Sequence, residues 1–150
     1  RLLSRKEKIQ QLSQLQEQLF TKCEPDVEKI VFYEMDDKNM LHIYLQEPYS
    51  YAIVIPFGMN ENNFNPLNGL AVPATNEANP VIWEKDNENK TYIKCLLKIS
   101  RDDPRQNNFQ EIMEKLAEQG YKTGTAIARY LVTAKETLSY DFYKAWIEIL

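Results

Sequence analysis

Residues 91–99 read TYIKCLLKI, and in this run every second side chain from Ile93 to Ile99 is apolar. An extended chain places such side chains on one face of a sheet. The alternation therefore predicts a β-strand that buries one face, and the rest of the chain is best interpreted around that sheet.

Other segments upstream show the β-branched and aromatic residues that are typical of strands. Residues 28–34, 40–46 and 50–57 predict three strands, which short polar turns join into a meander. Residues 81–85 predict the partner of 91–99 in a second hairpin, across a turn of aspartate and asparagine.

A helix follows the predicted hairpin. Apolar residues recur at helical spacing from Phe109 to Leu116, and Gly120 stands where a helix would end. This pattern predicts one packed helix over about residues 107–119.

Residues 1–22 predict a leading helix, because apolar residues from Ile9 to Leu19 recur three or four positions apart. Basic residues crowd its first turns, where the helix dipole favours acids, so we expect it to continue from a truncated upstream region. It either docks on its own domain or forms a short coiled-coil seam for self-association. Residues 23–150 are expected to form a single α+β domain.

Residues 125–134 and 139–150 are compatible with helices and with strands. Their aromatic and β-branched side chains favour a final hairpin, and a pair of helices is the alternative. With that hairpin the expected fold is α+β: a mostly antiparallel sheet of roughly five to seven strands, one packed helix and the leading helix.

Residues 58–80 are rich in asparagine and proline and carry few apolar side chains. Loops of this length are uncommon inside compact domains and are often functional. Phe64 and Val72 could hold the segment against the core, and a short helix within it is an alternative.

The 150 residues suit one domain with its own core. The formal net charge of -4 disfavours general binding to nucleic acids or anionic membranes. Cys23 and Cys95 are too few for a disulfide framework, so we expect reduced thiols and a cytoplasmic location. No apolar run approaches the length of a membrane span.

The residue types that catalysis and metal binding need are sparse. His42, the one histidine, lies on a predicted strand where a structural role is expected, and it forms no zinc-binding pattern with the cysteines. Acidic residues gather around Asp36 and Glu84 in predicted turns, where they are expected to be solvated. The sequence predicts no metal and no cofactor, and it leaves enzymatic activity uncertain while favouring its absence.

Two weaker patterns concern anions. Lys122 and Thr123, between two glycines, have the residue types of an anion pocket but lack the spacing of a phosphate-binding loop. Arg101, Arg105 and Arg129 could join Lys122 in a nucleic-acid patch, yet neighbouring aspartates make ordinary surface charge the better interpretation.

The aromatic segment near the C-terminus is the richest feature of the sequence. Tyr140, Phe142, Tyr143 and Trp146 can bury a large area, and such clusters belong to cores more often than to binding platforms. An excess of aromatic side chains on an outer face would mark a partner site.

These observations favour a non-catalytic protein-interaction or regulatory module of a larger intracellular protein, which binds a protein partner or other domains of its own chain. The alternative is a small-ligand sensor or a hydrolase with a pocket between the sheet and residues 58–80. Candidate pocket residues are His42, Glu34, Asp36, Tyr44 and Glu84. The wider ligand or partner surface would comprise His42, Tyr44, Glu34, Glu84, Phe64, Lys122, Thr123, Tyr143 and Trp146.

Overall fold

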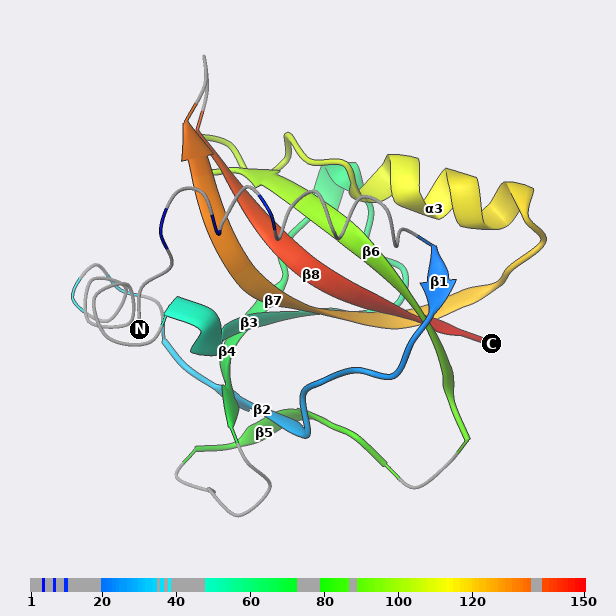
Figure 1. Cartoon of the computed structure of the whole chain (residues 1–150), viewed down its shortest axis with the longest axis horizontal. Helices are drawn as coiled ribbons and strands as arrows, with labels where there is room; N and C mark the ends of the chain where they lie inside the picture. The colour runs from blue at the N-terminus through cyan, green and yellow to red at the C-terminus, as the bar shows by residue number, and fades with distance from the viewer. Residues whose placement is uncertain are drawn as a thin grey trace.

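A computed structural model of the chain describes residues 4, 7, 10, 20–34, 36, 38, 48–72, 79–86, 89–135 and 139–150. In this part of the chain, eight strands form one antiparallel sheet in the order β1-β6-β8-β7-β3-β4-β2-β5. The helix α3 packs on the sheet (Figure 1).

The strands are β1 (Thr21–Lys22), β2 (Lys29–Phe32), β3 (Tyr51–Ile55), β4 (Leu67–Val72), β5 (Val81–Glu84), β6 (Thr91–Ser100), β7 (Thr123–Lys135) and β8 (Ser139–Ile149). The helix α3 spans Phe109–Glu118, and two short 3-10 turns cover Pro48–Ser50 (η1) and Glu61–Asn63 (η2).

Three long strands, β6, β8 and β7, form one half of the sheet and lie side by side in Figure 1. β8 pairs along its length with both neighbours, matching Tyr140 to Ser100 on β6 and Ser139 to Lys135 on β7. The register of β7 shifts at two places, one of them between Tyr130 and Val132, and such bulges increase strand twist.

Apolar side chains cover both faces of the sheet. On the helix face, Ile112 and Leu116 of α3 pack with strand residues such as Ala128 in one buried cluster. On the opposite face, Ile127 and Trp146 belong to a second buried cluster. Successive residues of one strand point to opposite faces, so β7 and β8 contribute to both clusters.

The expected fold is wrong in its number of strands and in the last residues of its leading helix. The sheet has eight strands rather than five to seven. Residues 21–22, assigned to the end of the leading helix, instead form β1 and pair with Ile93 and Lys94 of β6. Most of residues 1–19 lies outside the described residues. Of the three that are described, Glu7 is helical, and its backbone N–H donates to Ser4 Oγ at 3.2 Å.

The predicted hairpin of 81–85 with 91–99 is also wrong. Both strands exist, but β5 pairs with β2, whereas β6 pairs with β8 and β1. Residues 58–80, expected to be a loop, contain β4, which lies between β2 and β3 and separates two strands of the expected meander. The predicted strand 40–46 lies outside the described residues.

Two predictions of local structure are confirmed. The helix expected over 107–119 is α3, Phe109–Glu118. The final hairpin is formed by β7 and β8, and the alternative pair of helices is excluded. The helical period identifies the helix, whereas the hairpin was favoured over helices because of its aromatic and β-branched side chains.

Candidate functional site

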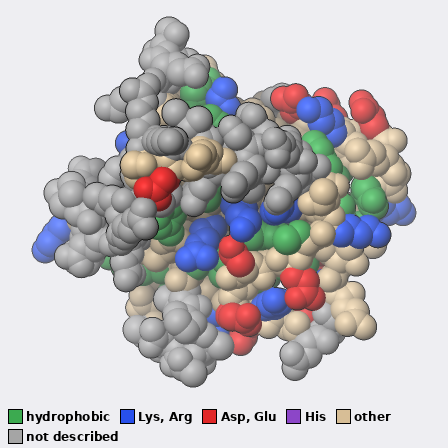
Figure 2. Space-filling view, viewed as in Figure 1, with side chains coloured by type: hydrophobic (Ala, Val, Ile, Leu, Met, Phe, Trp, Pro, Cys, Tyr) green, Lys and Arg blue, Asp and Glu red, His purple; other side chains and the backbone are tan. Residues whose placement is uncertain are grey.

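Basic side chains from three adjacent strands lie on the sheet face opposite α3. Arg129 of β7 stands directly opposite Lys144 of β8, and Lys144 stands opposite Leu96 of β6. Lys94 and Lys98 flank Leu96 two residues away on either side, so all four cations point to one side. We call the group formed by the half-buried Lys98, Arg129 and Lys144 and by the buried Lys94 the basic face; Figure 2 shows basic side chains gathered near the centre of the view.

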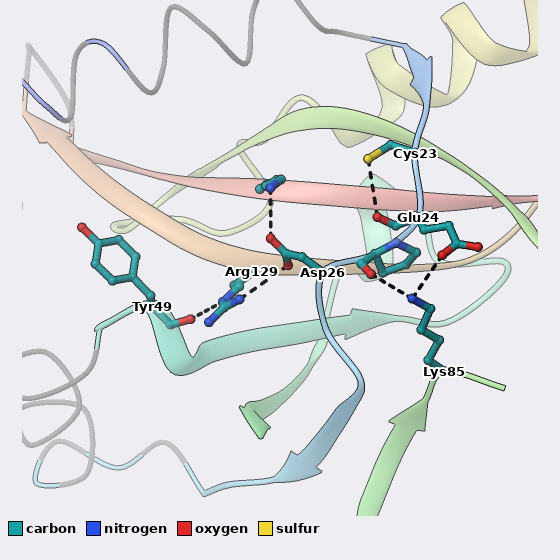
Figure 3. Close-up of polar contacts among 8 residues, drawn as sticks. Cys23, Glu24, Asp26, Tyr49, Lys85 and Arg129 are labelled. Carbon is teal, nitrogen blue, oxygen red and sulfur yellow. Dashed lines mark hydrogen bonds and ion pairs between the residues drawn. The ribbon is translucent and has the colours of Figure 1, made fainter. Parts of the chain in front are cut away.

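Asp26 brings a carboxylate to the basic face. Its Oδ2 accepts a hydrogen bond from Lys144 Nζ at 3.0 Å, and its Oδ1 lies 3.5 Å from Arg129 Nη1. Arg129 Nε donates to the backbone carbonyl of Tyr49 at 2.6 Å, so the guanidinium lies between Tyr49 and Asp26 (Figure 3). One carboxylate therefore bridges two cations that belong to neighbouring strands.

Asp26 belongs to the segment that links β1 to β2, residues 23–28, which bends at Asp26 and Glu28 and which we call the strap. Pro25 and Val27 are buried, and Asp26 between them is exposed. Lys85 Nζ donates to the Pro25 carbonyl at 3.3 Å and lies 3.4 Å from Glu24 Oε2 (Figure 3). These contacts fix the backbone from which Asp26 reaches Arg129.

The charges of the basic face repel one another. Like charges directly opposite across an antiparallel pair are destabilising, and Arg129 and Lys144 occupy such a pair. Their side chains are 32% and 26% exposed, so water screens the repulsion only in part. Among the described residues, Asp26 is the carboxylate that offsets this repulsion between Arg129 and Lys144.

Aromatic rings lie beneath two of these cations. Lys98 Nζ is 4.1 Å from the ring centroid of Tyr140, and Lys144 Nζ is 5.2 Å from that of Trp146. Cation–π contacts of this kind hold the ammonium groups near the sheet surface. Two cations of the basic face thus rest on aromatic rings, those of Tyr140 and of the buried Trp146.

A second polar cluster lies on the helix face of the same strands. Tyr130 and Thr133 share a hydrogen bond of 2.6 Å between their hydroxyls, and Thr133 Oγ1 donates to Asp141 Oδ1, also at 2.6 Å. Arg101 Nε lies 3.3 Å from the same carboxylate. Burial raises the pKa of Asp141, and it raises the pKa of nearby Tyr51 to about 12. These groups satisfy one another, which is typical of a structural network.

The two thiols lie in different surroundings, Cys95 buried in the sheet and Cys23 half-buried in the strap. Burial raises the pKa of the Cys95 thiol to about 12, which keeps it protonated and inert. Cys23 Sγ lies 3.4 Å from the carbonyl of Glu24. Within the described ranges, no three His, Cys, Asp or Glu side chains are grouped so that they could hold a metal ion. No helix in the same ranges is both long and apolar enough to cross a membrane.

The residues that the sequence suggested as a ligand or partner surface are spread over the core and the surface. Phe64 and Tyr143 are buried on the helix face, and Trp146 is buried on the opposite face. Glu34 and Lys122 are exposed. His42 and Tyr44 lie outside the described residues, and Asp36 is exposed.

The remaining two suggested residues line different cavities. Thr123 lines a cavity of about 360 Å³ between α3 and the turn after β3, and its Oγ1 lies 3.6 Å from Met113 Sδ. Glu84 lines a cavity of about 300 Å³ beside β5, and its Oε1 lies 4.0 Å from Lys29 Nζ. The two do not share a site.

Sequence reasoning missed the basic face because it grouped cations by their distance along the chain. Arg129 was placed with Arg101 in one patch, but Arg101 pairs with Asp141 on the helix face, whereas Arg129 faces the strap. The available signal was the spacing of Lys94 and Lys98, which puts both on the face opposite the predicted core.

Comparisons of the chain with models of protein families, with curated proteins and with solved structures give no match. The functional argument therefore rests on geometry and charge.

Proposed function

We propose that the protein is a non-catalytic interaction module of a larger intracellular protein, and that its basic face binds an acidic segment of a protein partner. One observation carries the proposal: Arg129 and Lys144 are paired across β7 and β8, and in the described part of the chain one carboxylate, that of Asp26, lies between them. A fold selected for stability alone gains nothing from this repulsion, whereas a binding site needs it.

Arg129 is suited to such binding because its orientation is already fixed. Its Nε donates to the Tyr49 carbonyl at 2.6 Å, and only Nη1 contacts Asp26, at 3.5 Å. A guanidinium has several N–H donors in one plane, so those that remain can bind a carboxylate of the partner. Lys144 adds a second cation within reach of the same partner segment.

Asp26 acts in this proposal as an internal substitute for a carboxylate of the partner. It occupies the position between Arg129 and Lys144 where an acidic side chain of a bound segment would gain most. A partner would either displace Asp26 or bind beside it, so the strap would limit affinity and favour partners with more than one acidic residue.

The charge distribution favours an acidic peptide over a nucleic acid. The net charge of -4 repels a polyphosphate at long range, and Asp26 places a negative charge within the basic face. A peptide with spaced carboxylates carries less negative charge than a nucleic acid, so the protein repels it less, and its carboxylates can pair with individual cations.

The test is a titration followed by NMR of the full chain. The probe is a short peptide in which glutamate alternates with glycine, and its partner probe has glutamine in place of glutamate. We expect the glutamate peptide to shift the amide signals of Arg129 and Lys144. Lys144→Glu should weaken binding about tenfold or more, since tenfold corresponds to about 1.4 kcal/mol, and Asp26→Asn should strengthen it.

The matched control is Lys122→Glu, which makes the same charge change at an exposed lysine outside the basic face. It should leave affinity within about twofold of the unmodified protein. If Lys122→Glu and Lys144→Glu lowered the affinity for the peptide equally, the loss would come from the net charge of the protein, and this would contradict the proposal. If a single-stranded oligonucleotide bound more tightly than the peptide, the partner would be a nucleic acid and the proposed protein partner would be wrong.

A further inference from the structure

The cavity beside β5 has the features of a small-molecule site, and it is separate from the basic face. It opens on the sheet face opposite α3, with a volume of about 300 Å³, at the lower end of the range of ligand pockets. Side chains from strands β3 to β8 contribute to its lining. The lining includes apolar Val54, aromatic Trp83 and Tyr92, and the charged residues Lys90 and Glu148.

Aromatic rings form one wall of the cavity. Trp83 and Tyr92 meet edge to face, with ring centroids 6.5 Å apart and an interplanar angle of 75°. Both also pack in the cluster that contains Val54, which fixes their positions. The faces of such rings carry partial negative charge and attract cations.

The charged residues that line the cavity are Glu84, Glu148 and Lys90, so the lining carries an excess of negative charge. Lys90 Nζ lies 3.3 Å from Glu148 Oε2, and it also lies 3.1 Å from Oδ2 of Asp86, which is outside the lining. The Glu148 side chain is 15% exposed, less than the 37% of Lys90 and the 43% of Asp86. Glu148 is therefore the most desolvated charge of the three and gains most from a second cation.

Gly124 provides the space that Glu148 occupies. A Cβ at Gly124 would collide with Glu148 Oε1 and would come within 3.1 Å of its Cδ. Glycine inside a strand weakens the strand, and it often marks a close approach of another group. Here the group that approaches is the carboxylate of the cavity.

We infer that this cavity binds a small organic cation, namely an amine or quaternary ammonium with an apolar or aromatic body. The ammonium would lie against Glu148 and the faces of Trp83 and Tyr92, and the apolar body would contact Val54. A small anion would have to compete with Glu148 and Asp86 for Lys90, and it would face the aromatic ring faces with the wrong charge.

The test uses three probes of similar size on the full chain: phenethylamine, benzyltrimethylammonium and the anion 3-phenylpropionate. Binding is followed by tryptophan fluorescence and by the indole signal of Trp83 in NMR spectra. The two cations are expected to bind with a Kd of about 1 mM or tighter, typical of such small ligands. The anion should bind at least about tenfold more weakly.

Two variants should change the affinity for phenethylamine in opposite directions. Glu148→Gln removes the carboxylate and should weaken binding about tenfold, whereas Lys90→Gln removes the competing ammonium and should strengthen it. Opposite effects cannot come from partial unfolding of both variants. Glu118→Gln, at an exposed position of α3, is the control and should leave the affinity unchanged.

Three results would overturn the inference: equal affinity for the cations and for 3-phenylpropionate, weaker binding in both cavity variants, or no shift of the Trp83 indole at about 10 mM cation. None of these results bears on the acidic-peptide proposal, because Glu148 and Lys90 are not part of the basic face.

Discussion

At the scale of a single residue, Gly69 illustrates how the absence of a side chain permits close packing of three strands. It lies in β4 and pairs with Phe32 on β2 and with Ala52 on β3. An added Cβ would collide with the Val31 carbonyl oxygen and come within 2.7 Å of Ile30 Cγ2. The obstacle is space, because backbone and a buried side chain stand where the methyl group would lie.

We therefore predict that Gly69→Ala lowers the free energy of unfolding by about 1–3 kcal/mol, the range for overpacking a core. Denaturant unfolding of the full chain measures this change in the free energy of unfolding. Gly58→Ala is a suitable comparison, because Gly58 has φ +87° but open space around it. A left-handed conformation alone costs about 1–2 kcal/mol. If Gly69→Ala lowered the free energy of unfolding clearly less than Gly58→Ala does, β4 would be able to move away from β2 to make room for the added methyl group.

At the scale of secondary-structure elements, the side chain of Asn108 takes the place of a strand neighbour. β1 pairs with β6 only at Ile93 and Lys94. Further along, Asn108 Oδ1 accepts from the Lys98 backbone N–H at 2.8 Å, and Asn108 Nδ2 donates to the Leu96 carbonyl at 3.0 Å. Asn108 immediately precedes α3, so it also ties the start of the helix to the sheet.

Asn108→Ala should lower the free energy of unfolding by about 1–3 kcal/mol, because it leaves a part-buried donor and acceptor without these bonds. Hydrogen exchange of the Lys98 amide should become faster than in the unmodified protein. Asn62→Ala, at an exposed position in η2, should change stability by less than about 0.5 kcal/mol. Unchanged exchange at Lys98 in Asn108→Ala would mean that another group protects this amide.

The sequence predicts which face of an element is buried better than it predicts which elements are neighbours. The periodicity from Phe109 to Leu116 identifies α3, and the aromatic residues around Tyr143 identify the last hairpin. Neither pattern carries information about distant partners. Residues 81–85 were therefore paired with the next strand in the chain, although Trp83 of β5 pairs with Ile30 of β2.

The same limit explains the errors in strand number and in the candidate site. β4 was missed because Asn68 and Gly69 resemble loop residues, and only the pairing with β2 and β3 makes this segment a strand. The basic face requires Arg129 and Lys144 to be opposite each other, and the register of β7 with β8 contains a bulge that no local pattern specifies. Lys94 and Lys98 alone were within reach of sequence reasoning.

At the scale of the whole molecule, the two buried clusters depend on the same strands. Ala145 and Ile147 of β8 pack on the helix face, whereas Trp146 between them packs on the opposite face. Neither cluster can lose its order while β8 stays paired with both neighbours. We therefore expect the helix face and the opposite face to unfold in one cooperative transition.

Leu116→Ala tests this expectation, because Leu116 is fully buried on α3 and its truncation should cost about 2–5 kcal/mol. Trp83 and Trp146, the two tryptophans of the chain, both lie in the cluster opposite α3, so their fluorescence reports on that face. Methyl signals of Ile112 report on the helix face.

In Leu116→Ala, the unfolding midpoints reported by the two probes should move to the same lower denaturant concentration. Lys115→Ala, an exposed change on the same helix, should change the free energy of unfolding by no more than about 0.5 kcal/mol with either probe. Loss of the Ile112 signals while the tryptophan fluorescence remains native would show that α3 unfolds as a separate unit. In that case the sheet alone would support the basic face, and acidic-peptide binding by Leu116→Ala would persist at denaturant concentrations that melt the helix.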